Sequence, residues 1–254
     1  MDAASPRHEL IESLRKRMAG VTAPARPAGT LAFEVDALDA RLGDGGISAS
    51  ALHEVAAGAS SLADAAAAPR FLAGLVARFA GATASALWAV TRFDLYGPGL
   101  EQAGLAPANA LFVESREDRD VLSVMEDALR QGSLAAVVGE VRRADMTATR
   151  RLQLAAAEGS TPAFLLRRWR RAGTCPLADP SAAATRWRIG CAPAQPLGIP
   201  GLGRHRWSVE LVRQRNGAPF SLVLEGCDET GRLALPATAL DRAAAADSGI
   251  ARAA

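Results

Sequence analysis

The segment from Gly58 to Ala65 occupies the place of a phosphate-binding loop, between a short apolar strand and an amphipathic helix. We expect the strand at residues 51 to 57 and the helix from Pro69 to Gly81, after a run of small residues. A working loop reads Gly-x-x-x-x-Gly-Lys-Ser/Thr, because backbone amides and one ammonium group hold the phosphates while the hydroxyl binds magnesium. The chain has Gly58-Ala59-Ser60-Ser61-Leu62-Ala63-Asp64-Ala65 instead. The lysine, the second glycine and the following hydroxyl are absent, and Asp64 adds a negative charge near the expected phosphates, so the pattern predicts the architecture of an ATPase without its chemistry.

Other residues do not restore the missing groups. Lys16 is the only lysine among the 29 basic residues, and the planar fork of an arginine is a poor substitute for an ammonium group in a tight loop. The strand expected at residues 134 to 138 should end in a magnesium-binding aspartate, but Gly139 stands there. Glu140 follows one residue later, on what we expect to be the other face of the strand. Asp94 is the only candidate to orient a water molecule, and we interpret Asp94 and Glu140 as solvated loop charges rather than catalytic groups.

Four arginines flank a tryptophan directly after the strand expected at residues 162 to 166. This candidate DNA-binding cluster consists of Arg167, Arg168, Trp169, Arg170 and Arg171. Such a cluster suits a single-stranded DNA backbone with one base stacked on the indole ring. The alternative, which we favour, is a strand exit whose arginines pair with nearby acidic residues or stay solvated.

The composition is typical of a globular protein with one main domain. Of 254 residues, 49% are hydrophobic and 22% are charged, so the chain can bury a sizeable core, and a net charge of +2 by itself indicates neither nucleic acid nor membrane. Cys175, Cys191 and Cys227 are odd in number and far apart, which predicts free thiols in a reducing cytoplasm. No signal peptide or apolar run of about 20 residues is visible, so we expect a cytoplasmic protein without membrane contact. From the degenerate loop we also expect no cofactor and no metal.

The chain divides into a core and three flanking segments. Residues 1 to 22 predict a helix with a narrow apolar stripe made of Leu10, Ile11, Leu14 and Met18. Residues 23 to 29 form a Pro-rich linker, residues 30 to 236 form the core, and residues 237 to 254 form an Ala-rich tail. A lone amphipathic helix behind a linker either folds back on its own core or docks on a partner. Both possibilities stay open at this point.

The core alternates between apolar strands and helices. Beyond the segments above, we expect helices at about 116 to 131 and 144 to 158, and strands at 84 to 90, 111 to 113, 186 to 189, 207 to 213 and 220 to 225. Apolar strands separated by helices indicate an α/β fold with a parallel sheet covered on both faces. Asn216-Gly217, between the last two strands, predicts a β-hairpin. The carboxyl ends of the parallel strands form the ligand-binding edge of such a sheet.

These features resemble the ImuA family of RecA-like proteins. The resemblance is carried by residues 38 to 47, 52 to 55, 117 to 131, 134 to 140, 200 to 207, 210 to 213 and 216 to 217. The Gly201-Leu202-Gly203-Arg204 motif and the hairpin separate this family from RecA itself. The similarity covers about residues 30 to 226. It implies a RecA-like, mostly parallel central sheet flanked by helices, with a C-terminal β-hairpin and an N-terminal helix.

The resemblance also implies a function and partners. The family is understood as a DNA-damage-induced accessory factor that works with ImuB, an inactive Y-family polymerase homologue, and with an error-prone C-family DNA polymerase in translesion synthesis. RecA is a suggested further partner. We therefore predict a non-catalytic adaptor of this machinery. The alternatives are an ATPase, an ATP-independent single-stranded DNA-binding factor and, through a distant similarity, a SulA-like inhibitor of cell division.

Overall fold

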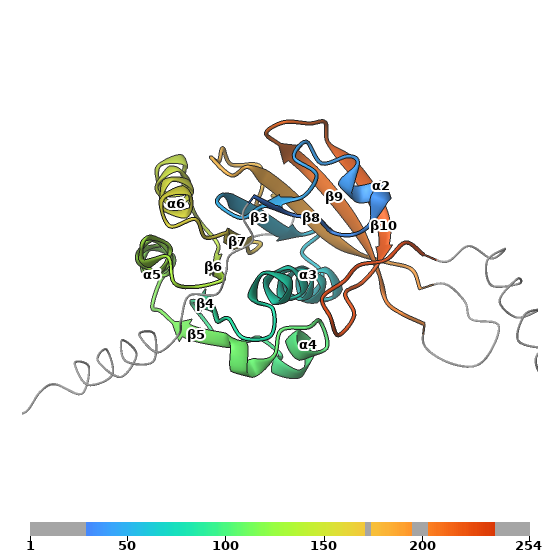
Figure 1. The fold of residues 1–254 in the computed structure, drawn as a ribbon, viewed down its shortest axis with the longest axis horizontal. Coiled ribbons are helices and arrows are strands. Elements are labelled where there is room, and N and C mark those ends of the chain that lie inside the picture. The colour runs from blue at the N-terminus through green and yellow to red at the C-terminus, as the bar shows by residue number, and fades with distance from the viewer. Residues whose placement is uncertain (1–28, 171–173, 195–202, 237–254) are drawn as a thin grey trace, which may run out of the picture.

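The computed structural model describes residues 29–170, 174–194 and 203–236 (Figure 1). The helix expected at residues 1 to 22 lies outside the described residues, and so does its stripe of Leu10, Ile11, Leu14 and Met18. Residues 23 to 28 of the linker, Arg171 and the tail at residues 237 to 254 lie outside them as well.

The main sheet of the described residues has eight strands in the order β10-β9-β8-β3-β7-β6-β4-β5. Their bounds are β3 Leu52–Ala57, β4 Ala86–Val90, β5 Ala110–Glu114, β6 Ala136–Val141, β7 Ala163–Arg167, β8 Thr185–Ala192, β9 Arg206–Gln214 and β10 Phe220–Glu225. The strands from β8 to β5 pair in parallel, and β9 and β10 are antiparallel. Two short strands, β1 (Thr30–Leu31) and β2 (Ile47–Ser48), pair separately. The predicted α/β fold with a mostly parallel sheet and a C-terminal hairpin is confirmed.

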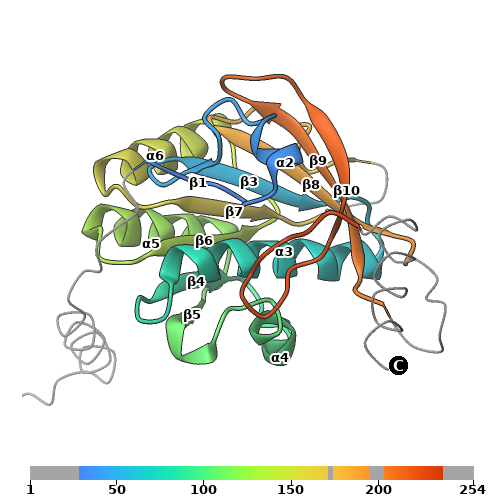
Figure 2. The ribbon, with the colours of Figure 1, turned by 45° about the vertical axis from the view of Figure 1, so that its right-hand side comes forward.

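Helices cover both faces of this sheet (Figure 2). The helices are α2 Asp36–Asp39, α3 Leu62–Ala80, α4 Gly97–Glu101, α5 Asp118–Gln131 and α6 Met146–Glu158, with a 3-10 turn at Pro107–Asn109. One core cluster lies between α3 and the sheet and includes Phe71, Trp187 and Trp207. A second cluster lies on the opposite face under α5 and α6 and includes Met125 and Leu165. None of the helices in the described part of the chain has the length and apolar character that a membrane span requires.

Helix α3 begins seven residues earlier than we predicted from Pro69. The Ser61 side chain caps its first turn by accepting a hydrogen bond from the Asp64 amide at 3.1 Å. The small residues before Pro69 are mostly alanines, which have the highest helix propensity, so they extend the helix rather than form a loop. Pro69 lies buried inside α3, where its missing N–H removes only one intrahelical hydrogen bond.

The predicted hairpin is present, but its turn is centred one residue earlier than the Asn-Gly pair. Gln214 and Gly217 form a bridge, which makes Arg215 and Asn216 the central residues, and neither of these has a positive φ. Gly217 is required for another reason, because a Cβ atom there would overlap the Gln214 side chain. That side chain also binds the Arg41 carbonyl oxygen at 2.9 Å, so it connects the hairpin to the turn after α2.

Candidate functional site

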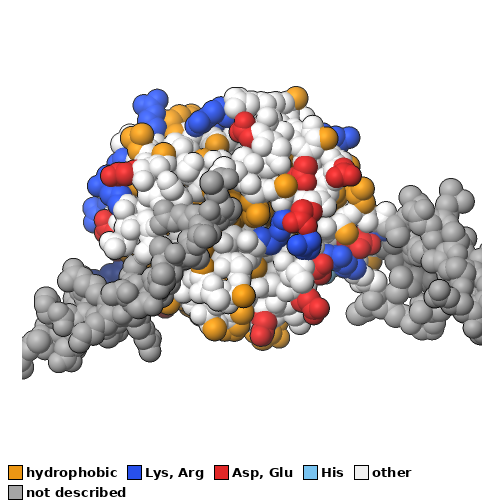
Figure 3. Space-filling view, in the orientation of Figure 1, with side chains coloured by type: hydrophobic (Ala, Val, Ile, Leu, Met, Phe, Trp, Pro, Cys, Tyr) orange, Lys and Arg blue, Asp and Glu red, His pale blue; other side chains and the backbone are white. Residues whose placement is uncertain are grey.

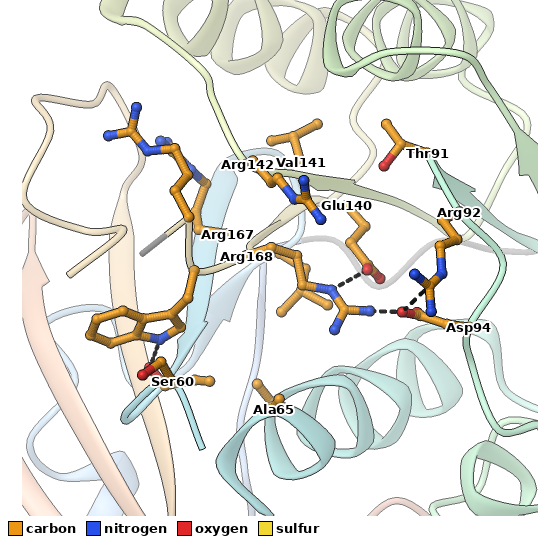
Figure 4. Close-up of a pocket in the computed structure, with 15 residues that line it drawn as sticks. Ser60, Ala65, Thr91, Arg92, Asp94, Glu140, Val141, Arg142, Arg167 and Arg168 are labelled. Atoms are coloured by element: carbon orange, nitrogen blue, oxygen red, sulfur yellow. Dashed lines mark hydrogen bonds and ion pairs between the residues drawn. The ribbon is translucent and has the colours of Figure 1, made fainter. Parts of the chain in front are cut away.

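A pocket of about 320 Å³ lies at the carboxyl edge of the sheet, beside the degenerate loop (Figure 4). The loop and α3 contribute Ser60 and Ala65 to its wall. The ends of β4, β6 and β7 contribute the charged residues Arg92, Asp94, Glu140, Arg142, Arg167, Arg168 and Arg170. This is the edge at which the sequence predicted a ligand site.

The Asp64 carboxylate points to β8. Its Oδ1 accepts a hydrogen bond from the Cys191 amide at 2.8 Å, and Asp64 does not line the pocket. Gly58 packs against the same region, since a Cβ atom there would lie 2.9 Å from the Gly190 Cα and 3.1 Å from Asp64 Oδ2. The Gly58 amide donates to the Ile189 carbonyl oxygen at 2.6 Å. The first turn of α3 and the loop are therefore held against β8 by the chain's own groups.

Glu140 is buried in β6, so the expectation of a solvated loop charge is wrong for this residue. The strand continues to Val141 because Glu140 and Val141 still pair with β7. Gly139 faces α5, where a Cβ atom would overlap the Met125 side chain. Glu140 therefore lies on the α3 face of β6, together with Val138, and its carboxylate lines the pocket.

Arg168 joins Glu140 to Asp94 (Figure 4). Its Nε donates to Glu140 Oε1, and its Nη2 donates to Asp94 Oδ1 at 2.7 Å. Burial raises the pKa of Glu140, whereas the Arg168 guanidinium acts in the opposite direction. The second oxygen of Glu140, Oε2, is buried without a hydrogen bond of ordinary geometry among the described residues, and the Trp88 side chain also acts on this carboxyl and lowers its pKa. Asp94, by contrast, is partly exposed, so one end of this cluster is dry and the other is in contact with solvent.

Arg167 borders the pocket, but its side chain is completely buried and points to Glu54, which corrects its place in the candidate DNA-binding cluster. Its Nη1 donates to Glu54 Oε1 at 2.8 Å, and Arg186 Nε donates to the other oxygen of Glu54 at 2.6 Å. The sequence signal for this buried Arg167–Glu54–Arg186 triad was Glu54, a charged residue in the otherwise apolar strand β3. Our sequence analysis did not use this signal. A phosphate backbone cannot reach Arg167 in this structure.

The other members of the cluster are also engaged with the protein. The Trp169 indole packs against the core and donates to the Ala57 carbonyl oxygen at 3.0 Å. Arg170 lies 3.7 Å from Asp179, and Arg171 is outside the described residues. On the face seen in Figure 3, acidic and basic side chains alternate without an extended field of one sign. The arrangement agrees with the alternative that we favoured, in which the arginines pair with nearby acids.

The described residues contain no group of three or more His, Cys, Asp or Glu side chains placed to hold a metal ion. Cys175, Cys191 and Cys227 are free thiols, as we predicted. Burial raises the pKa of Cys227 to about 12 and also raises the pKa of Cys191. Neither of these two thiols therefore has the lowered pKa of a reactive cysteine.

Comparison with known proteins gives clear sequence relatives. No protein-family model matches the chain. Protein ImuA from two strains of Caulobacter vibrioides, NA1000/CB15N and ATCC 19089/CIP 103742/CB 15, is 38% identical over 209 residues. The match covers 78% of this chain and 84% of each relative.

Solved structures agree on the fold. The RadB recombinase matches with a TM-score of 0.55 and 15% sequence identity, covering 82% of this chain and 100% of that chain. This likeness shows the RecA-like fold alone. SulA from Pseudomonas aeruginosa matches with a TM-score of 0.39 and 22% identity, over 46% of this chain and 98% of that chain, which is too low to show a shared fold.

Proposed function

Because the chain belongs to the ImuA family, we propose that it is a non-catalytic accessory protein of the DNA-damage-induced translesion synthesis machinery. In this proposal the RecA-like core serves as a scaffold, and protein contacts perform the function. The observation that carries the proposal is the pairing of both pocket carboxylates, Glu140 and Asp94, with Arg168.

An ATPase needs the opposite arrangement at this edge. A metal-bound nucleotide requires a lysine in the loop and free carboxylates that orient the metal shell and the attacking water. Here the loop has no lysine, and an internal guanidinium holds the two carboxylates. The absence of the loop lysine and the presence of Arg168 both disfavour binding of a metal-bound nucleotide. An ATP-dependent cycle is therefore less well supported than the accessory function.

The proposed partners are ImuB and, through ImuB, an error-prone C-family polymerase, with RecA as a second direct partner. We place these contacts in the two terminal segments. The apolar stripe Leu10, Ile11, Leu14 and Met18 has the i, i+3, i+4 spacing with which an amphipathic helix enters a groove. The Ala-rich tail at residues 237 to 254 is the second proposed contact segment.

Co-purification of the full chain with ImuB and RecA tests this proposal. Deleting residues 1 to 22 should weaken association with RecA, and deleting residues 237 to 254 should weaken association with ImuB. Both truncations should keep the thermal midpoint of the full chain, because neither segment contributes to the core in this proposal. A matched control replaces Leu10, Ile11, Leu14 and Met18 by serine, which removes the stripe without shortening the chain. Full affinity of all variants for both partners would contradict the proposal.

A further inference from the structure

An open groove of about 830 Å³ lies beside the pocket, at the first turns of α5 and α6. Thr91, Arg92 and Arg142 line both the pocket and the groove, so the two hollows are continuous along the carboxyl edge of the sheet (Figure 4). The loops after β4, β5 and β6 give the groove five arginines, which are Arg92, Arg116, Arg119, Arg142 and Arg143. Its three acidic residues are Glu117, Asp118 and Asp145. Positive charge is therefore in excess in the lining.

Asp118 fixes the loop between β6 and α6. Its Oδ2 accepts hydrogen bonds from the backbone amides of Arg142 at 3.2 Å and of Arg143 at 2.8 Å. The carboxylate therefore binds the backbone of the loop. The side chains of Arg142 and Arg143 are both exposed, and neither guanidinium has an ion pair or a hydrogen bond in the part of the chain that the structure describes. The loop thus holds two unpaired cations in a fixed position.

The other two acidic residues of the groove are engaged as well. Asp145 Oδ1 caps α6 by accepting a hydrogen bond from the Ala148 amide at 2.7 Å. Glu117 pairs with Arg119 at 3.2 Å. Arg116 is exposed and, like the two arginines of the β6–α6 loop, has no ion pair with a described residue. The groove therefore presents three arginines whose charge the described residues do not neutralise directly.

An exposed aromatic pair lies next to these arginines. Phe93 directly follows Arg92 in the loop after β4, and 52% of its surface is exposed. Its ring contacts Phe112 of β5 edge to face, at 5.2 Å between centroids. Arginines that bind phosphates, together with exposed rings on which bases stack, are the combination with which proteins hold single-stranded nucleic acid. Trp169 cannot supply this ring, because its indole packs against the core.

We propose that this groove binds the phosphodiester backbone of single-stranded DNA, with Arg116, Arg142 and Arg143 on the phosphates and Phe93 under a base. The bases of a duplex are stacked inside it, so only a single strand can use the ring. The choice of DNA rests on the proposed function, which acts in the response to DNA damage. The site itself differs from the run of residues 167 to 171, whose described arginines are paired within the protein.

Fluorescence anisotropy of a labelled oligothymidylate of about 20 nucleotides with the full chain tests the proposal. Each neutralised phosphate contributes about −0.7 to the slope of log K against log salt, so three arginines predict a slope of about −2. Arg142→Ala/Arg143→Ala should reduce the slope to about −0.7 and weaken binding at least about tenfold at low salt. This variant keeps the amides that Asp118 binds, so its Tm should equal that of the wild type.

Arg150→Ala/Arg215→Ala is the matched control, since it removes the same charge from two exposed residues outside the groove. It should keep the slope and the affinity of the wild type. Phe93→Ala should weaken binding at least about fivefold at every salt concentration and leave the slope unchanged, because a ring stacks on a base without neutralising a phosphate. Leu154→Ala removes another exposed apolar side chain, on α6, and should bind as the wild type does.

Three results would overturn the proposal. The first is a wild type without saturable binding of the oligothymidylate at low salt, and the second is equal affinity of Arg142→Ala/Arg143→Ala and its control. The third is equal binding of a duplex, or displacement of the oligothymidylate by oligoglutamate of equal charge at equal concentration, which would indicate an acidic protein segment as the ligand. Truncations that keep full affinity for ImuB and RecA would instead contradict the proposed function and leave these DNA measurements valid.

Discussion

At the residue scale, two adjacent arginines have different environments and different consequences. Arg167 belongs to a buried triad with Glu54 and Arg186, and Arg168 belongs to a pocket that contacts solvent. The sequence shows only a run of basic residues around Trp169. Successive side chains of a strand point to opposite faces of the sheet, so the face of each arginine can be assigned only once the last residue of the strand is known. The position of the last paired residue decides which guanidinium is buried with Glu54 and which one binds the pocket carboxylates.

The triad gives a stability prediction. Glu54→Ala removes the buried carboxylate that Arg167 and Arg186 share and leaves Arg167 only the half-exposed Asp179, at 3.6 Å, so we expect a loss of about 3–5 kcal/mol in the free energy of unfolding. Chemical denaturation of the two proteins measures this difference. The exposed Glu101→Ala is the control and should change the stability by less than about 0.5 kcal/mol. Equal stability of Glu54→Ala and the control would mean that the triad is not buried in solution.

His53 gives a prediction on pH dependence. The ring is completely buried; its Nε2 lies 2.9 Å from the Ser48 carbonyl oxygen and its Nδ1 lies 2.8 Å from Thr185 Oγ1. A carbonyl oxygen only accepts, so the neutral ring carries its proton on Nε2, and Nδ1 accepts from the Thr185 hydroxyl. The Trp187 indole N–H donates to the same hydroxyl oxygen at 2.7 Å. Burial lowers the pKa of His53 to about 4.

The unfolded chain binds a proton at His53 below a pH of about 6.5, whereas the folded chain does not until about pH 4. The stability that neutral His53 contributes is therefore complete above pH 6.5 and is lost as the pH falls from 6.5 to 4. Between pH 7 and pH 5 this loss amounts to about 2 kcal/mol. Denaturation of the wild type and of His53→Gln at both pH values checks it, since the variant should lose about 2 kcal/mol less over this interval. Identical pH dependence of the two proteins would contradict the assignment.

At the scale of elements, the strands and helices of the core followed from apolar runs and their spacing. The strand order did not, because pairing between β3 and β7 or between β3 and β8 joins segments that are far apart in the chain. The sequence also placed the start of α3 and the end of β6 incorrectly. Ser61 begins α3 before Pro69, and pairing with β7 extends β6 through Glu140. Because of the second error, the sequence analysis placed Glu140 in a loop, whereas the structure places it in the pocket wall.

Packing of β6 on α5 can be tested at Gly139. Gly139→Ala introduces a methyl group that overlaps the Met125 side chain, and we expect a loss of about 1–3 kcal/mol because a flexible methionine yields only in part. The double variant Gly139→Ala/Met125→Ala should lose less stability than the sum of the two single variants, since the second change makes room for the first. Unfolding free energies of the four proteins measure this coupling. Strictly additive losses would place Gly139 away from α5.

At the scale of the whole molecule, one edge of the sheet carries the features on which the proposed non-catalytic function rests. The loop at Gly58 is held against β8, the pocket carboxylates are paired with Arg168, and Trp169 is bound to the Ala57 carbonyl oxygen. These contacts support the proposal that the core works without a nucleotide. The sequence could indicate the missing lysine but not the internal cation, because Arg168, Glu140 and Asp94 meet only through the pairing of β4, β6 and β7.

Isothermal titration of magnesium-ATP into the full chain tests this central claim most directly. Charge-assisted hydrogen bonds are each worth about 1.5–3 kcal/mol, and the loop lacks the lysine that makes the strongest of them with the phosphates. We therefore predict no saturable binding, with any Kd above about 1 mM. Saturable binding with a micromolar Kd would contradict the account, and it would do so decisively if Asp94→Ala abolished it.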